Sequence, residues 1–249
     1  MIKFFRKIRQ QLLTENKFSK YVLYAIGEII LVVIGILIAL QINTWNQERL
    51  ASIEEEIILK NINTEFLQNK ETIKASIKGS EIAMVSGTTL FNLFGKDRSE
   101  IDNHNIDSLL FNSLEPASFR PSENTISDLL QSGRLQLLKN NRLKDLIHEW
   151  SKTMKSYVNS QVRIEAKIDE EYVSYLSRNY SMKNIDRFSR LNWKNKTILK
   201  IDEFQIFQDI EFENLLDDYL YRLTTKDLNI SNLDKLVDEI IEVTDSNDD

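Results

Sequence analysis

The 249-residue sequence contains no cysteine, which excludes disulfide bonds, thiol nucleophiles and thiolate metal sites together. Recognisable catalytic signatures are missing as well: there is no G-x-S-x-G, no Gly-rich phosphate loop, no H-E-x-x-H and no Cys–His combination. Paired carboxylates occur, but they carry no information in a helical chain with 28% charged residues. The sequence therefore predicts a protein that is not an enzyme and needs no metal or cofactor.

Helix-breaking residues are also scarce, since the chain has only two prolines and six glycines. What it does have is one long apolar run, YVLYAIGEIILVVIGILIALQI at residues 21–42, with a single ionisable group, Glu28. At about 1.5 Å per residue, a helix of this length is about as long as the ~30 Å hydrocarbon core of a bilayer is thick. The run predicts a transmembrane helix that follows a short head at residues 1–20.

A cleaved signal peptide is the alternative interpretation of a basic start followed by an apolar run. Its apolar region should span only about 7–15 residues and end in an A-x-A-like site. Here the run is longer and leaves through IALQIN at residues 38–43, where no such site occurs. An uncleaved anchor is therefore favoured.

The charges that flank the span predict its orientation. The head contains one acidic residue, Glu15, and the first twenty residues after the span contain only two basic ones, Arg49 and Lys60. The basic residues of the head number six: Lys3, Arg6, Lys7, Arg9, Lys17 and Lys20. Because positively charged flanks stay in the cytoplasm, we expect a cytoplasmic head and a long C-terminal part on the other side of the membrane.

The head itself has two open interpretations. Residues 2–13, IKFFRKIRQQLL, suit a helix at the inner-leaflet interface, where each basic residue contributes about 1 kcal/mol near anionic lipid. They also suit a positive-inside tail without fixed structure. In both cases the sequence predicts membrane-interface residues on the two sides of the span: Lys3, Arg6, Lys7 and Arg9 inside, and Trp45 outside.

Polar and small residues in the span are candidates for helix–helix contacts. Glu28 lies roughly 10 Å along the helix from Tyr21, and an acidic group deeper in hydrocarbon costs on the order of 2.5–3.5 kcal/mol. It either marks the cytoplasmic boundary of a shorter span in a thinned bilayer or contacts a partner helix. Gly35 and Ala39 form a small-xxx-small pair, with Gly27 on roughly the same face, which predicts close packing against another helix.

Apolar residues recur at intervals of three and four over three long segments, at about 47–94, 141–175 and 210–245, with a soft break near 229–231. Shorter helices are expected near 106–114 and 123–132, the latter capped by Ser122 or Thr125, and the segment 181–200 is expected to be irregular. The predicted fold is all-α: an N-terminal transmembrane helix continues into a bundle of long antiparallel helices at residues 43–245, crossing near 20°. An acidic disordered tail follows at 246–249.

The part after the span has 26 basic and 36 acidic residues, a net charge of −10. A surface of that sign repels nucleic acid and anionic lipid, so we expect neither as a partner of the outer domain. The bilayer that holds the span, other membrane proteins of the envelope and a second copy of the chain remain as partners.

Two side-chain groups in the second long segment could in principle form sites. Asp145, His148 and Glu149 lie on one turn of a helix at a spacing that di-metal bundles use, but such sites need further ligands, and a solvated helix face is favoured. The aromatic residues could line the bottom of a ligand cleft, although packing in the core explains their spacing more simply. They are Trp150, Tyr157, Tyr172 and Tyr175.

Three stretches of the sequence resemble an uncharacterised family of single-span membrane proteins of Bacteroidetes. They are MIKFFRKIRQ, NKFSKYVLYAIGEIILVVIGILIALQINTWNQER and, less specifically, TISDLLQSGRLQLLKNNRLKDLI. The chain has NTWNQ where the family has NNWNE, which weakens any special role for that dipeptide. The resemblance implies a two-membrane envelope, a span in the inner membrane and a periplasmic C-terminal domain; it implies no activity.

The function expected from these features is that of an inner-membrane-anchored protein whose helical domain binds another envelope protein or itself. The alternative is a ligand-sensing periplasmic bundle, which would need a partner with a cytoplasmic output domain because the head is too short to be one. An enzyme is the third and least favoured possibility.

Overall fold

The computed structural model describes residues 18–245, and these residues form helices without a β-strand, with 80% of them helical. The all-α prediction is confirmed. The predictions for the interfacial helix at 2–13 and the acidic tail at 246–249 fall outside the described residues. The chain divides into two compact units, which meet in sequence between Ile57 and Ile58 and are described one at a time.

The first unit contains the N-terminal part of helix α2 (Phe18–Phe91), which is 74 residues long. Over residues 25–42, apolar side chains cover the helix on all sides and nearly all are exposed, among them Leu31 at 70% and Ile42 at 60%. A uniform apolar surface of this kind is typical of a segment whose solvent is lipid.

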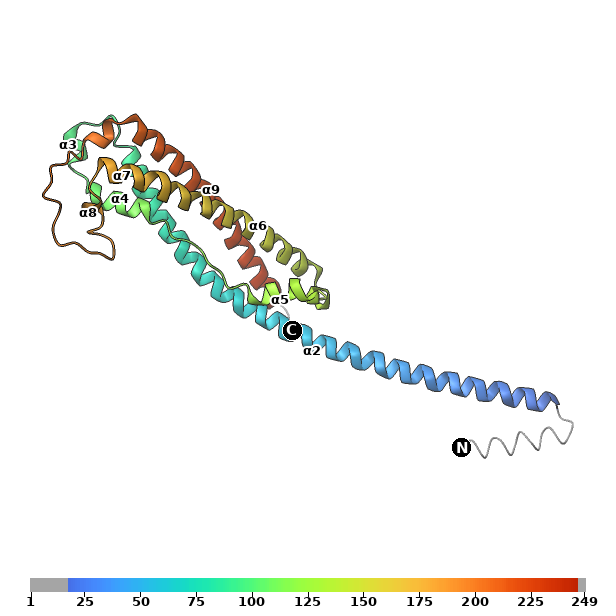
Figure 1. The fold of residues 1–249 in the computed structure, drawn as a ribbon. Coiled ribbons are helices and arrows are strands. Elements are labelled where there is room, and N and C mark those ends of the chain that lie inside the picture. Colours follow the sequence, from blue (N-terminus) through green and yellow to red (C-terminus); the bar gives the residue numbers. More distant parts are fainter. Residues whose placement is uncertain (1–17, 246–249) are drawn as a thin grey trace. The chain divides into compact units, whose positions relative to one another are not determined.

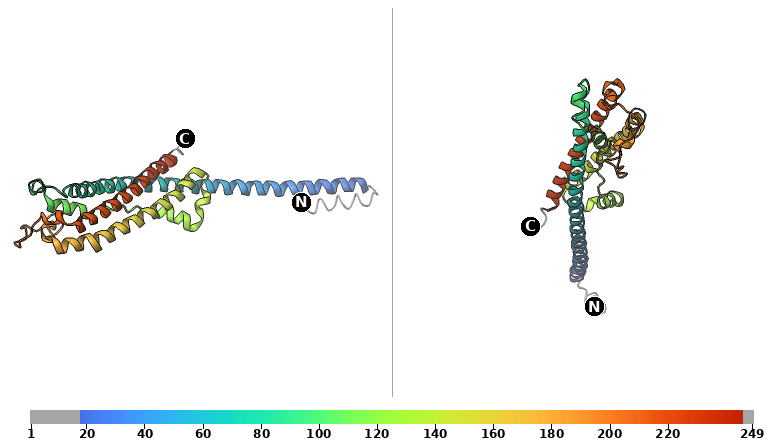
Figure 2. Two further views of the ribbon diagram at one scale, coloured as in Figure 1. Left: turned by 90° about the horizontal axis from the view of Figure 1, so that it is seen from above. Right: turned by 90° about the vertical axis from the view of Figure 1, so that its left-hand side faces the viewer.

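The second unit contains the rest of α2 and all later helices (Figures 1 and 2). Their bounds in chain order are α3 (Arg98–Ile101), α4 (Ile106–Leu114), α5 (Asn124–Ser132), η1 (Arg134–Leu137), α6 (Asn141–Ala166), η2 (Lys167–Tyr172), α7 (Val173–Asn179), α8 (Met182–Ile185), η3 (Gln205–Gln208) and α9 (Ile210–Asp245).

Helices α6, η2 and α7 follow one another without interruption, so the long helical segment expected from residue 141 is confirmed. Asn140 begins it by accepting a hydrogen bond from the N–H of Leu143 at 3.2 Å, as an N-cap does. The turn η2 has π-helical geometry. Helix α9 runs from Ile210 to Asp245 as expected, but without the soft break near 229–231, because Ile230 and Leu233 are buried in the core and hold the helix there.

Contacts along the helices set their directions. In α2 and α9, Asn63 donates to Thr244 at 3.0 Å and Lys70 pairs with Asp234 at 2.8 Å, so these two helices are antiparallel. Helix α9 also runs antiparallel to α6. The α2 and α6 helices instead run in the same direction, because residues 92–140 return the chain to the starting end of the unit (Figure 1). The prediction of antiparallel packing is therefore wrong for this pair.

The apolar stripes of the three long segments meet in two core clusters. The proximal core, which includes Ile58, is closed by α5 and the segment before it; the distal core is closed by α4, α8 and η3. Phe66 and Trp150 pack edge to face in the proximal core, with ring centroids 4.9 Å apart. The proximal core contains Ile58, Ile62, Phe66, Ile73, Phe119, Ile126, Leu129, Leu138, Leu143, Leu146, Ile147, Trp150, Met154, Tyr157, Ile230, Leu233, Leu236, Val237 and Ile240. The distal core contains Ala83, Leu90, Leu93, Ile101, Ile106, Leu110, Ile164, Ile168, Tyr172, Tyr175, Leu176, Tyr180, Ile185, Ile206, Phe207, Phe212, Leu215, Leu216, Tyr219 and Leu223.

Between the two cores, α2 approaches the returning chain closely at Gly79. A Cβ atom built on Gly79 would lie 2.5 Å from the Cβ of Ala117, closer than real Cβ contacts. Glycine in a helix interior ordinarily lowers stability by about 1 kcal/mol relative to alanine. Here it is required by the packing.

We expect Gly79→Ala to lower the free energy of unfolding by about 1–2 kcal/mol, since overpacking outweighs the gain in helix propensity. Unfolding of the full-length protein in detergent micelles, followed by far-UV circular dichroism, measures the change. The double variant Gly79→Ala/Ala117→Gly should recover most of the loss. A single variant that is more stable than the wild type would contradict the close contact.

Candidate functional site

The most conspicuous surface of the described chain is the apolar part of α2. It contains an 18-residue window that is long and apolar enough to cross a membrane, and none of that window is buried; no other described helix meets the same criteria. Gly27 and Gly35 have open space around them, since no atom lies within 4 Å of a Cβ built at either position. Glu28 is half-buried, and Trp45 is 64% exposed.

The predicted helix-packing face thus lies on an uncovered surface. Gly27, Gly35 and Ala39 are all exposed. The predicted basic interface residues Lys3, Arg6, Lys7 and Arg9 lie outside the described residues. Of the predicted interface set, the structure therefore places only Trp45, three residues beyond the apolar run.

The second feature is a set of buried polar side chains that hold the extended segment 115–123 by its backbone. This segment includes both prolines, Pro116 and Pro121, and forms no helix. We call the side chains of Glu65, Asn69, Tyr157 and Lys226 the backbone clamp; Glu65 bonds to Thr125, just beyond the segment, and Ser80 supports the clamp through Lys226. The clamp side chains come from α2, α6 and α9, so the clamp ties all three long segments to the returning chain.

Asn69 makes the most complete contact of the clamp. Its side-chain oxygen accepts from the N–H of Ser122 and its side-chain nitrogen donates to the C=O of Ser122, both at 2.8 Å. One residue therefore satisfies both backbone groups of another, as a neighbouring strand would. Asn69 is only 1% exposed, so water cannot readily replace it.

Glu65 and Tyr157 extend the clamp at either side of Ser122. The hydroxyl of Tyr157 accepts from the N–H of Phe119 at 2.6 Å, and the carboxylate of Glu65 accepts from the N–H of Thr125 at 2.8 Å. The prediction that Ser122 or Thr125 caps α5 is wrong. Glu123 occupies the N-cap position without a side-chain cap, and the capping acceptor comes from another helix.

Lys226 is the most deeply buried charged group, with no exposed surface. Its Nζ donates to the C=O of Ala117 at 2.7 Å and to the hydroxyl of Ser80 at 3.2 Å, while Ser80 donates to Asp227 at 2.5 Å. Burial lowers the pKa of Lys226, although the neighbouring carboxylates of Asp227 and Glu165 oppose this. Burial likewise raises the pKa of Asp227, against the Ser80 hydrogen bond and the charge of Lys226.

The four aromatic residues proposed as a cleft floor are core residues, each at most 1% exposed. Their polar atoms are engaged: Trp150 donates to Glu123 at 2.9 Å, and the Tyr172 hydroxyl lies 2.9 Å from that of Ser113. Tyr175 donates to Asp209 at 2.7 Å beside a small hollow of about 340 Å³. The spacing that suggested a cleft is therefore explained by core packing, apart from this edge of Tyr175.

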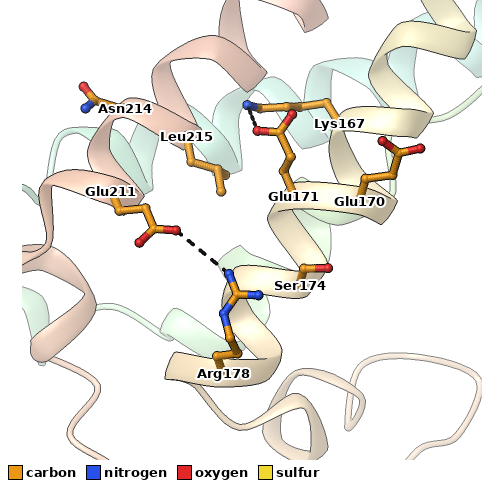
Figure 3. A pocket seen from close by; sticks show the side chains of 8 residues that line it. All are labelled: Lys167, Glu170, Glu171, Ser174, Arg178, Glu211, Asn214 and Leu215. Carbon is orange, nitrogen blue, oxygen red and sulfur yellow. Dashed lines mark hydrogen bonds and ion pairs between the residues drawn. The ribbon is translucent and has the colours of Figure 1, made fainter.

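A larger surface pocket of about 410 Å³ lies where η2 and α7 face α9 (Figure 3). Lys167 pairs there with Glu171 at 2.6 Å and with Asp218 at 2.8 Å, and Arg178 faces Glu211 at 3.9 Å. Burial disfavours the charged form of Lys167, but the two hydrogen-bonded carboxylates outweigh it and raise the pKa. Cations and anions in the pocket offset one another, as in a structural ion-pair network.

The metal hypothesis finds no support in the arrangement. Asp145, His148 and Glu149 are exposed on α6, and the described residues bring no group of three or more metal-ligating side chains together. The three form one solvated helix face.

Comparison of the chain with protein-family models, with curated proteins and with solved structures gives no match. The described geometry alone therefore carries the functional argument. The clamp was not anticipated from the sequence, since its partners are separated by as many as 109 positions, as Lys226 and Ala117 are. The one signal in the sequence was the pair of prolines, which indicates a segment whose backbone N–H and C=O groups cannot form helical hydrogen bonds with one another.

We expect Asn69→Ala to lower the free energy of unfolding by about 2 kcal/mol, because it leaves two part-buried backbone groups of Ser122 without partners. Asn69→Asp, which keeps the acceptor and loses the donor, should fall between the wild type and Asn69→Ala. Chemical denaturation of the full chain measures both.

The matched control is Asn214→Ala on the surface of α9, where the asparagine is exposed and bonds to no other described residue. It should change stability by less than about 0.5 kcal/mol. Equal effects at the two asparagines would contradict the structural role of Asn69.

Proposed function

We propose that the protein is a non-catalytic, single-pass membrane protein with a cytoplasmic head and a helical domain in the periplasm that binds another envelope protein or a second copy of itself. The observation that carries this proposal is the apolar window in α2, none of which is buried. Each square ångström of apolar surface left in water costs about 25 cal/mol, and lipid removes that cost.

Retention of the span, rather than its cleavage as a signal peptide, is supported by the helix itself. Helix α2 continues from the apolar run to Phe91, so no extended or small-residue segment separates the run from the domain. The orientation is supported by the six basic residues of the head against one acidic residue.

The absence of a catalytic role is supported by how the buried polar groups are used. Lys226, Tyr157 and Asn69 each bond to the backbone of the returning segment, so they act as structural donors and acceptors. Both cations of the charged pocket, Lys167 and Arg178, are paired with carboxylates. Self-association is supported by the uncovered face of Gly27, Gly35 and Ala39, because small residues let two helices approach closely in lipid.

Single-cysteine labelling tests the anchor and its orientation, because the chain has no cysteine of its own. Ser156→Cys places a thiol on the exposed surface of α6, and Gln10→Cys places one in the head. We expect a membrane-impermeant maleimide to label the first in cells with a permeabilised outer membrane and the second only after lysis. Both variants should stay in the membrane pellet at alkaline pH.

Release at alkaline pH would contradict the anchor, and labelling of Gln10→Cys before lysis would contradict the orientation. The two failures are separate, so each part of the proposal is tested on its own.

Gly35→Leu tests self-association through the small-residue face. A bulky side chain there prevents close approach, and we expect the dimer dissociation constant in micelles to rise by about tenfold or more. Sedimentation equilibrium in density-matched detergent measures it. Leu37→Phe, which adds volume on the opposite side of the helix, is the control and should leave association unchanged.

Equal association of Gly35→Leu and the wild type would show that this face is not the interface. Glu28→Gln belongs in the same series, because an altered dimer would assign Glu28 a contact with a partner helix, and an unaltered dimer with normal insertion would assign it the boundary role.

A further inference from the structure

The segment 181–200, between α7 and η3, has a composition unlike the rest of the domain. It contains six basic residues and one acidic residue, Asp186, whereas the part after the span as a whole has a net charge of −10. The basic residues are Lys183, Arg187, Arg190, Lys194, Lys196 and Lys200. We call this segment the basic loop. The negative net charge of the whole domain does not reveal this local excess of basic residues.

Four basic side chains of the loop are exposed and uncompensated. Lys183, Arg190, Lys194 and Lys200 make no hydrogen bond or ion pair with any other described residue. Elsewhere in the domain some cations are paired, as Lys70, Lys167 and Arg98 are with carboxylates, and others, such as Lys152 and Lys155, are exposed without a partner among the described residues. The loop thus presents a positive charge that the molecule itself does not neutralise.

The same loop exposes several large apolar side chains close together in the sequence, whereas the other exposed apolar residues of the domain, such as Ile210 and Tyr221, are scattered. Ile198 is 95% exposed and Leu199 is 74% exposed, values that no residue buried in either core approaches. Leu191 and Trp193 are also about half exposed, and Phe188 is 39% exposed although its ring lies near that of Phe111. Exposed apolar and basic residues therefore alternate along the loop.

The base of the loop is held in place, so this exposure is a property of a fixed segment. Lys196 pairs with the buried carboxylate of Asp107 at 2.8 Å and with Glu203 at 3.2 Å. The N–H of Thr197 donates to the side chain of Asn184 at 2.8 Å. These contacts leave the exposed residues on both sides of Lys196 directed away from the core.

Within the second unit, the loop lies at the end where α2 finishes. Ile185, within the loop, and Ile206, which follows it, pack in the distal core together with Leu90 and Leu93 (Figures 1 and 2). At 1.5 Å per residue this end is about 50 Å along α2 from Ile58.

We propose that the basic loop binds the surface of an anionic bilayer, with Trp193, Ile198 and Leu199 entering the interface and the flanking basic side chains at the level of the lipid phosphates. Interfacial segments combine aromatic and aliphatic residues with Lys and Arg in this way. The head at residues 1–20 has the same ratio of six basic residues to one acidic residue. This proposal differs, for this loop, from the expectation that anionic lipid is not a partner of the domain.

A bilayer fits the loop better than an acidic protein does. A protein partner would dock on a continuous patch of about 800 Å² with pockets for its side chains. The apolar residues here project separately from an irregular segment, and neither surface hollow described above is lined by any of them.

Full-length protein in nanodiscs of phosphatidylcholine tests this, since zwitterionic discs hold the span without attracting the loop. The measurement is co-sedimentation of the loaded discs with sucrose-filled vesicles of phosphatidylglycerol and phosphatidylcholine. We expect binding that Lys194→Glu/Lys200→Glu weakens at least tenfold, since each basic residue near anionic lipid contributes about fivefold. Ile198→Ser/Leu199→Ser should weaken binding similarly.

Matched controls come from α6. Lys152→Glu/Lys155→Glu reverses two exposed charges and Val158→Ser/Val162→Ser removes two exposed apolar residues away from the loop, and neither should change binding. Lys3→Glu/Lys7→Glu measures the contribution of the head, and the loop variants should still lose affinity in that background.

Loop variants that bind as well as the wild type would overturn the proposal. Loss with the charge variant alone would overturn the insertion of apolar side chains. Loop-dependent association of loaded discs with one another, without vesicle binding, would assign the loop to a protein partner instead. This proposal rests on the proposed anchor only because the assay holds the protein in discs. If size exclusion shows that the protein leaves the discs, the anchor proposal is wrong. The same loop variants are then assayed with the free full-length protein.

Discussion

The parallel course of α2 and α6 is the constraint on which the rest of the domain depends. Two consecutive antiparallel helices can be joined by a short turn, but a parallel pair needs a connection that returns along the whole domain. Residues 92–140 make that return, and part of the return is extended chain. Extended backbone inside a helical domain has no neighbouring strand to bond with, so side chains of the helices must supply its partners.

The backbone clamp meets this requirement and also explains why charged residues are buried. Lys226 loses its hydration on burial, which lowers its pKa, and it recovers part of that free energy through the C=O of Ala117 and the hydroxyl of Ser80. Asn69 and Glu65 serve the same purpose for Ser122 and Thr125. In a chain without disulfides, these contacts fix the returning segment between the two apolar cores.

Helices with a strong apolar period could be predicted from sequence nearly to the residue. Helix α4 begins and ends where expected, α6 begins at Asn141 as expected, and α9 spans 210–245. Each of these depends on neighbours within a few positions. The direction of α6 against α2 and the clamp could not be predicted, because they depend on pairs such as Asn69 and Ser122 that are 53 positions apart and leave no periodic signal.

The spacing of the apolar residues determines which of them the helical domain can bury. Within the second unit, most apolar residues that recur every three or four positions are buried in the cores, whereas apolar residues without this period have no common face to bury. Leu50, Ile53 and Ile57 keep the period in the first unit and are exposed. Large exposed apolar residues cluster in the apolar part of α2 and in the basic loop, with only scattered examples elsewhere among the described residues. The first cluster is long enough for the interior of a bilayer and carries almost no charge, whereas the second is short and interleaved with lysine and arginine, which suits the surface of one. The same physical rule that builds the helical domain thus separates both segments from it, and the depth in lipid that we propose for each follows from its length and charge.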